Sequence, residues 1–169
     1  RVLQSMWRES RGYPIGAHRG QPLGSRLAMP WAKETLANYL TETIRHVFRA
    51  EVLHNPDSTQ QVFQKPRIFR NLLSSQPLCF NLFGELQQNL ELATRVIEDL
   101  APARIAQVTD LRFEYSPGRG DPRYTDDRSA FDVYLEFRSP RDGTGFVGIE
   151  MKYSEDLGQR PARHRARYD

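Results

Sequence analysis

The chain has 169 residues and a formal net charge of +3, with 38% hydrophobic and 27% charged residues. This length and balance suit one globular domain with a buried core, and they exclude a collagen-like or low-complexity chain. The lone cysteine, Cys79, excludes a disulfide framework within the chain and favours a reducing, cytoplasmic setting, and no apolar run is long enough for a signal peptide or a membrane span.

The N-terminal part predicts helices separated by a looping segment. A short helix is expected near residues 2–9, and the glycine and proline residues spread over positions 12–24 then favour an extended or looping chain. Pro30 suits the start of a helix, and apolar residues at steps of three and four predict an amphipathic helix over 32–52. Beyond it only short turns are expected, such as one at 68–73. Because the sequence begins at Arg1 rather than Met, we expect an excerpt of a longer protein.

The second half changes from helical to strand periodicity. A long helix is expected at about 81–100, and Cys79 just before it lies in an apolar stretch that predicts a small buried side chain. Strands are then predicted at 105–115, 131–137 and 146–153, with helix in part of the tail from 154 onward. Helices followed by consecutive strands predict an antiparallel meander packed on helices.

An acid on one predicted strand and an acid–lysine pair on the next form the candidate site. Strand alternation places Glu150 and Lys152 on one face, and Asp132 lies on the preceding strand. Pairing Arg138 with Phe146 would place Asp132 opposite Lys152, and a slip of two positions would place it opposite Glu150. Both registers bring the three side chains within roughly 5–8 Å of each other. A slip of one position would separate Asp132 from the pair.

Two carboxylates and one lysine are a minimal set for cleaving a phosphodiester bond. Carboxylate oxygens bind a hard divalent cation such as Mg²⁺, which polarises the phosphate and lowers the pKa of a bound water. A nearby lysine orients that water or stabilises the developing charge. The alternative is a two-sided hairpin with one polar face. Asp132 is the more informative acid, because Phe131 and Val133 beside it predict a strand with a buried side.

Two stretches carry this site and a wider similarity. They are Ser116-Pro117-Gly118-Arg119-Gly120-Asp121-Pro122 through Ser129-Ala130-Phe131-Asp132-Val133, and Gly148-Ile149-Glu150-Met151-Lys152-Tyr153. Together they resemble the PD-(D/E)XK nuclease superfamily, and within it a microbial branch of restriction-endonuclease-like proteins. Phe131 departs from the family signature, which has a proline before the aspartate.

The resemblance implies an α/β fold with α+β-like order, in which a central mixed sheet with an antiparallel three-strand meander is flanked by helices. The resembling core runs from about 74 to 153. We therefore expect one domain over 1–169, with a helical N-terminal extension at 1–73 and a nuclease-like core at 74–169. The final strand of the family is not evident before the C-terminus.

The resemblance also assigns roles to residues of the site. It implies that Asp132 and Glu150 bind Mg²⁺, with Mn²⁺ as a substitute, and that Lys152 assists the attacking water. Many members of the family place a further acid on the helix before the strands, and Glu85 is the matching candidate for a metal ligand. The alternative for Glu85 is a solvated residue stabilised by the helix dipole.

Three arginines in the loop before Asp132 are candidates for binding nucleic acid: Arg119, Arg123 and Arg128. Arginine favours bidentate contacts with phosphate, and the mildly basic charge suits a polyanionic partner without requiring one. The alternative is that these arginines pair with neighbouring aspartates.

The favoured function is a metal-dependent nuclease that acts on DNA rather than RNA. The alternative is a non-catalytic module of the same fold that binds nucleic acid or a partner protein. An accessory domain of a larger defence or repair protein also stays open. A homodimer is a further expectation, because restriction-type enzymes often pair to cut both strands.

Overall fold

The computed structural model describes residues 1–55, 62–102, 104–121, 123, 129–141 and 143–154. Its helices are α1 (Val2–Ser10), α2 (Trp31–Thr35), α3 (Glu42–Phe48), the π-helical turn η1 (Arg49–Leu53), α4 (Arg67–Arg70), α5 (Ser75–Gln88) and α6 (Leu90–Leu100). Its strands are β1 (Ile15–His18), β2 (Gln21–Leu27), β3 (Gln107–Tyr115), β4 (Phe131–Ser139) and β5 (Gly143–Ile149). In these ranges no helix combines the length and the apolar character needed to span a membrane.

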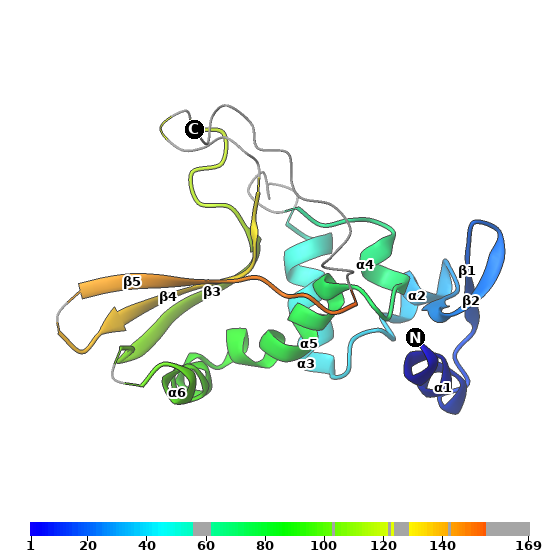
Figure 1. Ribbon diagram of the computed structural model, residues 1–169, viewed down its shortest axis with the longest axis horizontal. Coiled ribbons are helices and arrows are strands. Elements are labelled where there is room, and N and C mark those ends of the chain that lie inside the picture. Colours follow the sequence, from blue (N-terminus) through cyan, green and yellow to red (C-terminus); the bar gives the residue numbers. More distant parts are fainter. Residues whose placement is uncertain (56–61, 103, 122, 124–128, 142, 155–169) are drawn as a thin grey trace.

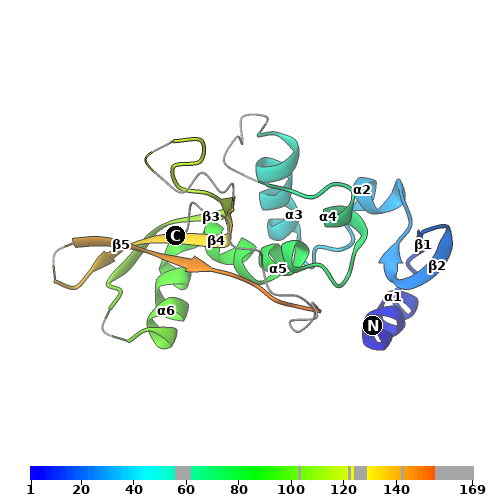
Figure 2. The same ribbon diagram turned by 45° about the horizontal axis from the view of Figure 1, so that its top comes forward.

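A three-stranded sheet lies at one end of the molecule and a small hairpin at the other, with helices between them (Figures 1 and 2). β3, β4 and β5 pair antiparallel in sequence order, while β1 and β2 form the separate hairpin. This confirms the predicted α/β fold, with an antiparallel three-strand meander flanked by helices. Within the described residues the larger sheet holds these three antiparallel strands, so the strand that would make it mixed stays a prediction.

The N-terminal region agrees with the prediction in one place and differs from it in another. The segment over 12–24, expected to be extended or looping, includes extended strands that pair as the β1–β2 hairpin, whose turn places Arg19 and Gly20 at positive φ. The expected helix over 32–52 is interrupted because Leu36 has a left-handed φ of 51°, which ends α2. Thr41 then starts α3, and its side chain accepts a hydrogen bond of 3.2 Å from the Ile44 N–H. Residues 1–73 therefore contain a hairpin as well as helices.

The predicted helix over 81–100 is two helices that meet at Asn89. The Asn89 side chain accepts a hydrogen bond of 3.0 Å from the Leu92 N–H and so caps the start of α6. Leu86 and Ala93, on either side of the break, are both buried. Because the apolar period continues across the cap, the sequence pattern alone does not reveal the interruption.

The core forms where α5 lies between the sheet and α3. The ring of Phe80 on α5 stacks on Phe113 of β3 with centroids 4.1 Å apart, and it also contacts Phe48 of α3. Phe80 is 1% exposed, and full burial of a phenylalanine side chain contributes roughly 1.5–3 kcal/mol to stability. Cys79 beside it is buried, as its apolar surroundings predict. This packing fixes the first turns of α5 against the sheet.

The end of β5 positions the candidate site. The sequence predicts this strand over 146–153, but it begins at Gly143 and ends at Ile149. Glu150 and Lys152 therefore lie directly beyond the strand rather than within it. The predicted helix in the tail falls on residues 155–169, which lie outside the described part of the chain.

Candidate active site

The pairing of β4 with β5 brings the predicted acids together. Tyr134 lies opposite Gly148, and Val133 lies opposite Ile149, so the next pair along the ladder aligns Asp132 with Glu150. This is the second of the two registers that the sequence allows. The backbone N–H of Met151 donates a hydrogen bond of 2.6 Å to Asp132 Oδ2 and holds the chain beyond β5 against the start of β4.

Glu150 and Lys152 form an ion pair with each other. Their side chains are 55% and 49% exposed, and exposed ion pairs of this kind contribute at most about 1 kcal/mol to stability. Both groups also act on Asp132: the charge of Glu150 raises its pKa, and the charge of Lys152 lowers it. The three residues predicted from the sequence are therefore electrostatically coupled in the structure.

Phe131 departs from the family signature, and the structure shows what its side chain contacts. Its ring lies against Gly148 of β5, where any Cβ atom would clash with the ring. It also contacts Tyr134 and Phe146, with ring centroids 6.2 and 6.3 Å away. Strand alternation predicts that Phe131 shares a face with Val133. That prediction is wrong for Phe131, because its ring instead lies on the face of the sheet that carries Tyr134 and Phe146, which we call the aromatic face.

Glu114 is a third carboxyl group at the site, and sequence reasoning missed it. Phe113 lies opposite Val133 and Tyr115 lies opposite Phe131, so Glu114 of β3 aligns with Asp132 of β4. Glu114 of β3, Asp132 of β4 and Glu150, directly after β5, therefore align in one row, which we call the carboxylate row.

The backbone at Glu114 has an uncommon conformation for a residue other than glycine, with a φ of 48°. Tyr115 contacts Tyr134 on the aromatic face, with ring centroids 4.9 Å apart, whereas Glu114 is hydrogen-bonded to Gln76 of α5. The positive φ thus turns Glu114 toward the buried side, where it is 8% exposed. Backbone strain of this kind is often found at functional sites.

The protonation of the carboxylate row follows from its burial. Burial raises the pKa of Glu114 to about 8; the hydrogen bond with Gln76 opposes this rise, and the charge of Asp132 adds to it. Burial also raises the pKa of Asp132, while hydrogen bonds from the Met151 N–H and from Glu114 oppose that rise. At neutral pH Glu114 therefore holds a proton and donates it in a hydrogen bond to the Asp132 carboxylate.

Two adjacent carboxyl groups that are not both ionised at neutral pH have the donor chemistry that suits a hard divalent cation. A proton on Glu114 reduces the negative charge of the Glu114–Asp132 pair, and a bound cation would reduce it in the same way. The described residues contain no group of three His, Cys, Asp or Glu side chains already arranged as metal ligands. Glu150, the third member of the row, is paired with Lys152 instead.

The Glu85 side chain contacts a residue outside the carboxylate row. Its carboxylate accepts a hydrogen bond from the hydroxyl of Thr41, the residue that caps α3. The side chain that α5 supplies to the row is Gln76, which also accepts a hydrogen bond of 3.0 Å from the Gln64 N–H. The signal for Gln76 in the sequence is a polar residue at the start of an apolar helix. The role of Glu85 as a metal ligand stays a prediction.

The loop arginines divide into three cases. Arg123 donates to both carboxylate oxygens of Asp121, with Nη2 2.7 Å from Oδ2, which is the aspartate pairing considered as the alternative. These hydrogen bonds lower the pKa of Asp121. The backbone N–H of Arg119 donates to the Ser116 carbonyl at 3.3 Å. Arg128 lies outside the described residues.

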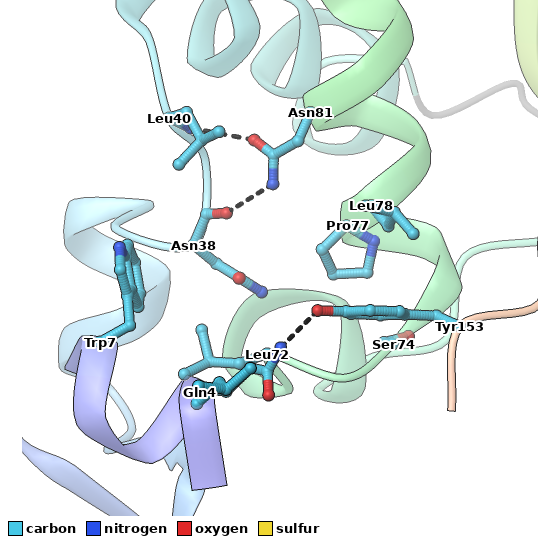
Figure 3. Close-up of a pocket in the computed structure, with 11 residues that line it drawn as sticks. Gln4, Trp7, Asn38, Leu40, Leu72, Ser74, Pro77, Leu78, Asn81 and Tyr153 are labelled. Carbon is cyan, nitrogen blue, oxygen red and sulfur yellow. Dashed lines mark hydrogen bonds between the residues drawn. The ribbon is translucent and has the colours of Figure 1, made fainter. Parts of the chain in front are cut away.

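A cavity of about 290 Å³ lies beside the chain that follows Lys152 (Figure 3). Tyr153 lines it, and the Tyr153 hydroxyl accepts a hydrogen bond of 2.5 Å from Gln4 Nε2 of α1. The Ser154 hydroxyl then donates to the Leu73 carbonyl at 3.1 Å. Lys152 is thus held between the Met151 contact with β4 and the contacts of Tyr153 and Ser154 with the N-terminal half.

Comparison with curated proteins and with solved structures gave no match. A family model does match, and it covers residues 1–169, which includes both the sheet and the N-terminal half that anchors the chain after β5. That model is described as the PD-(D/E)XK nuclease superfamily. The chain therefore belongs to the PD-(D/E)XK nuclease superfamily, and its mixed α/β architecture agrees with the fold of that family.

Proposed function

We propose that this protein is a metal-dependent nuclease that hydrolyses phosphodiester bonds of DNA in preference to RNA. The observation that carries the proposal is the carboxylate row with Lys152 at its end, on a fold of the nuclease type. Membership of the superfamily supports nucleic acid as the class of substrate. The choice of DNA and of Mg²⁺, with Mn²⁺ as a substitute, is part of the proposal.

Asp132 and Glu150, together with Glu114, would hold the divalent cation. When bound, the cation polarises the scissile phosphate and lowers the pKa of a bound water. Glu85 stays a candidate ligand, and it would have to leave its hydrogen bond with Thr41 to take part. The Met151 N–H keeps Asp132 in place, and Gln76 keeps Glu114 turned toward it.

Lys152 would act on the reacting phosphate rather than on the cation. Its ammonium group lies at Glu150 and is close enough to lower the pKa of Asp132. If Glu150 were to bind the cation, its carboxylate would no longer pair with Lys152. The ammonium group would then be available to stabilise negative charge on the phosphate or to orient the attacking water.

The test is cleavage of supercoiled plasmid, single-stranded DNA and single-stranded RNA with Mg²⁺, Mn²⁺ or EDTA. Wild type is compared with Asp132→Ala, Lys152→Ala and the control Glu98→Ala, an exposed residue of α6. We expect metal-dependent cleavage of DNA that falls by at least about 10³-fold in the first two variants and is unchanged in the control. A folded wild-type protein that binds DNA without cleaving it in any metal would instead support the non-catalytic module.

A further inference from the structure

Two long stretches of the N-terminal half contain basic residues and no acid. Between Glu9 and Glu34 the charged residues are all arginine or lysine, and the same holds between Asp57 and Glu85. The fold brings these stretches together, because β2 and α4 lie side by side (Figures 1 and 2). The surface that they form together therefore carries basic residues from both stretches.

Three arginines form the centre of this surface. Arg26 of β2 makes an isolated antiparallel bridge with Asn71, the residue directly after α4. Arg67 and Arg70 are three positions apart on α4, so they share one face of the helix. Arg26, Arg67 and Arg70 are named the arginine cluster here. All three are partly buried.

Two members of the arginine cluster lack the carboxylate partners that other arginines of the chain have. In the described residues Arg26 and Arg70 form no ion pair, and the Nε atom of each is buried without a hydrogen-bond partner. Arg67 donates to the neutral amide of Gln64 at 3.1 Å. By contrast, Arg112 pairs with Asp110 at 2.5 Å and Arg45 pairs with Glu42.

The members of the arginine cluster repel one another. Burial lowers the pKa of Arg26, and the charges of Arg70 and Arg67 lower it further. The positive charge of Arg26 also lowers the pKa of His18, in β1 of the hairpin, more than any other group does. An anion would relieve this repulsion, and arginine forms bidentate hydrogen bonds with phosphate groups.

We propose that the arginine cluster binds the phosphate backbone of the nucleic acid whose cleavage we propose at the carboxylate row. The inference rests on that proposed function for the identity of the ligand. It assigns substrate binding to β2 and α4 rather than to the loop arginines before Asp132. One of those, Arg123, is already paired with Asp121.

The arginine cluster is within reach of the same substrate molecule. Ser154, two residues after Lys152, hydrogen-bonds to Leu73, three residues after Arg70. Five residues of extended chain and one hydrogen bond span no more than roughly 25 Å. At a rise of about 3.4 Å per nucleotide, that distance corresponds to roughly seven nucleotides. Tyr153, next to Lys152, and Leu72, two residues after Arg70, both line the cavity of Figure 3.

The experiment measures binding of a fluorescent 16-base-pair duplex by anisotropy, in EDTA and over a series of salt concentrations. The full chain is compared with the double variant Arg26→Gln/Arg70→Gln. A matched control, Arg95→Gln/Arg138→Gln, removes two charges from arginines that share a different surface hollow between α6 and β4. The variant Arg26→Lys/Arg70→Lys retains the charge.

We expect the Arg26→Gln/Arg70→Gln protein to bind at least about tenfold more weakly near 0.1 M salt. The slope of log K against log salt should fall by roughly two, about one for each phosphate that the variant no longer neutralises. The lysine variant should keep most of the affinity, and the control should match wild type. The melting temperature of the glutamine variant should equal or exceed that of wild type, because the substitutions remove repulsion between the arginines.

Equal affinity and equal salt slope for Arg26→Gln/Arg70→Gln and the control would overturn the inference, even if the wild type cleaves DNA. The opposite result is also distinguishable. If the wild type binds through the arginine cluster but never cleaves in Mg²⁺ or Mn²⁺, the proposed nuclease activity fails while this inference stands. Binding of an acidic peptide by wild type that is lost in Arg26→Gln/Arg70→Gln, with duplex binding as tight as in wild type, would instead assign the surface to a protein partner.

Discussion

Two regions of the molecule, the carboxylate row and the arginine cluster, each contain several groups of like charge, and the repulsion is limited in different ways. In the carboxylate row, Glu114 keeps a proton and Glu150 is paired with Lys152, so the charge is reduced by titration and pairing. In the arginine cluster, Arg26 and Arg70 have no carboxylate partner in the described residues, and a guanidinium group does not lose its proton in a protein. We therefore expect pH to act mainly on the first region and salt or phosphate on the second.

The largest expected effect is a dependence of stability on pH in the metal-free protein. The pKa of Glu114 is about 8 in the folded state and near 4.5 in a reference peptide, so the folded state binds more protons between these values. The free energy of unfolding contributed by Glu114 is fully present below about pH 4.5 and is lost as pH rises toward 8. The slope is at most about 1.4 kcal/mol per pH unit.

Urea unfolding of wild type and Glu114→Gln at pH 5, 6, 7 and 8 measures this effect. Glutamine resembles the protonated acid, so the two proteins should be similar at pH 5 and the variant should become relatively more stable at pH 8. Parallel stability curves for the two proteins would contradict the assigned protonation.

The second effect concerns catalysis. Glu114→Gln retains the shape of the protonated acid but cannot supply a negative oxygen to a cation. Cleavage of plasmid in Mg²⁺ should fall by about 100-fold, while melting near neutral pH is not lowered. Initial rates at several Mg²⁺ concentrations measure this. A variant with wild-type rates at every concentration would remove Glu114 from the carboxylate row's function.

The third effect tests how the sheet end is tied to the N-terminal half. Tyr153→Phe removes the hydrogen bond from Gln4 and should lower the free energy of unfolding by about 0.5–1.5 kcal/mol. Cleavage should fall only a few-fold, because Lys152 is still held by the neighbouring contacts. Tyr13→Phe, at a tyrosine that contacts Trp7 through its ring, is the matched control for urea unfolding and cleavage. Equal behaviour of the two variants would show that the bond to α1 does not matter.

The smallest effect distinguishes Arg70, which has no carboxylate partner among the described residues, from Arg112, which has two. Arg70→Gln should leave the free energy of unfolding unchanged or raise it by a few tenths of a kcal/mol, because it removes repulsion. Arg112→Gln breaks partly exposed pairs with Asp110 and Glu136 and should lower it by about 0.2–1 kcal/mol. Urea unfolding in low and high salt measures both, and the difference should shrink as salt screens the charges. If Arg70→Gln lowered the free energy of unfolding more than Arg112→Gln does, this would contradict the absence of a carboxylate partner for Arg70 among the described residues.

Local patterns in the sequence predict the parts of the site that depend on neighbouring residues. The alternation in β4 and the acid–lysine pair after it are enough to place Asp132 and Glu150 together in one of two registers. The place of Glu114 in the site cannot be predicted from the sequence, for two reasons. Its alignment with Asp132 depends on a register set across a long loop, and its positive φ turns it toward the buried side, against the strand pattern.

Other features depend on tertiary contacts that no local pattern contains. The arginine cluster exists because Arg26 bridges Asn71, two residues that are far apart in the sequence. The interruptions at Leu36 and Asn89 lie inside apolar periods that a continuous helix would satisfy equally well. The glycine and proline residues over 12–24 predict an extended or looping chain, but they do not reveal that its backbone pairs as β1 and β2.

The most direct test of the central claim is calorimetric titration of Mn²⁺ into wild type, Asp132→Ala and Glu85→Ala, with folding checked by circular dichroism. We predict that wild type binds the cation and that Asp132→Ala loses binding. Weaker binding by Glu85→Ala would support Glu85 as a further ligand, whereas unchanged binding would show that Glu85, which is hydrogen-bonded to Thr41, takes no part. Binding that survives Asp132→Ala would contradict the assignment of the carboxylate row as the cation site.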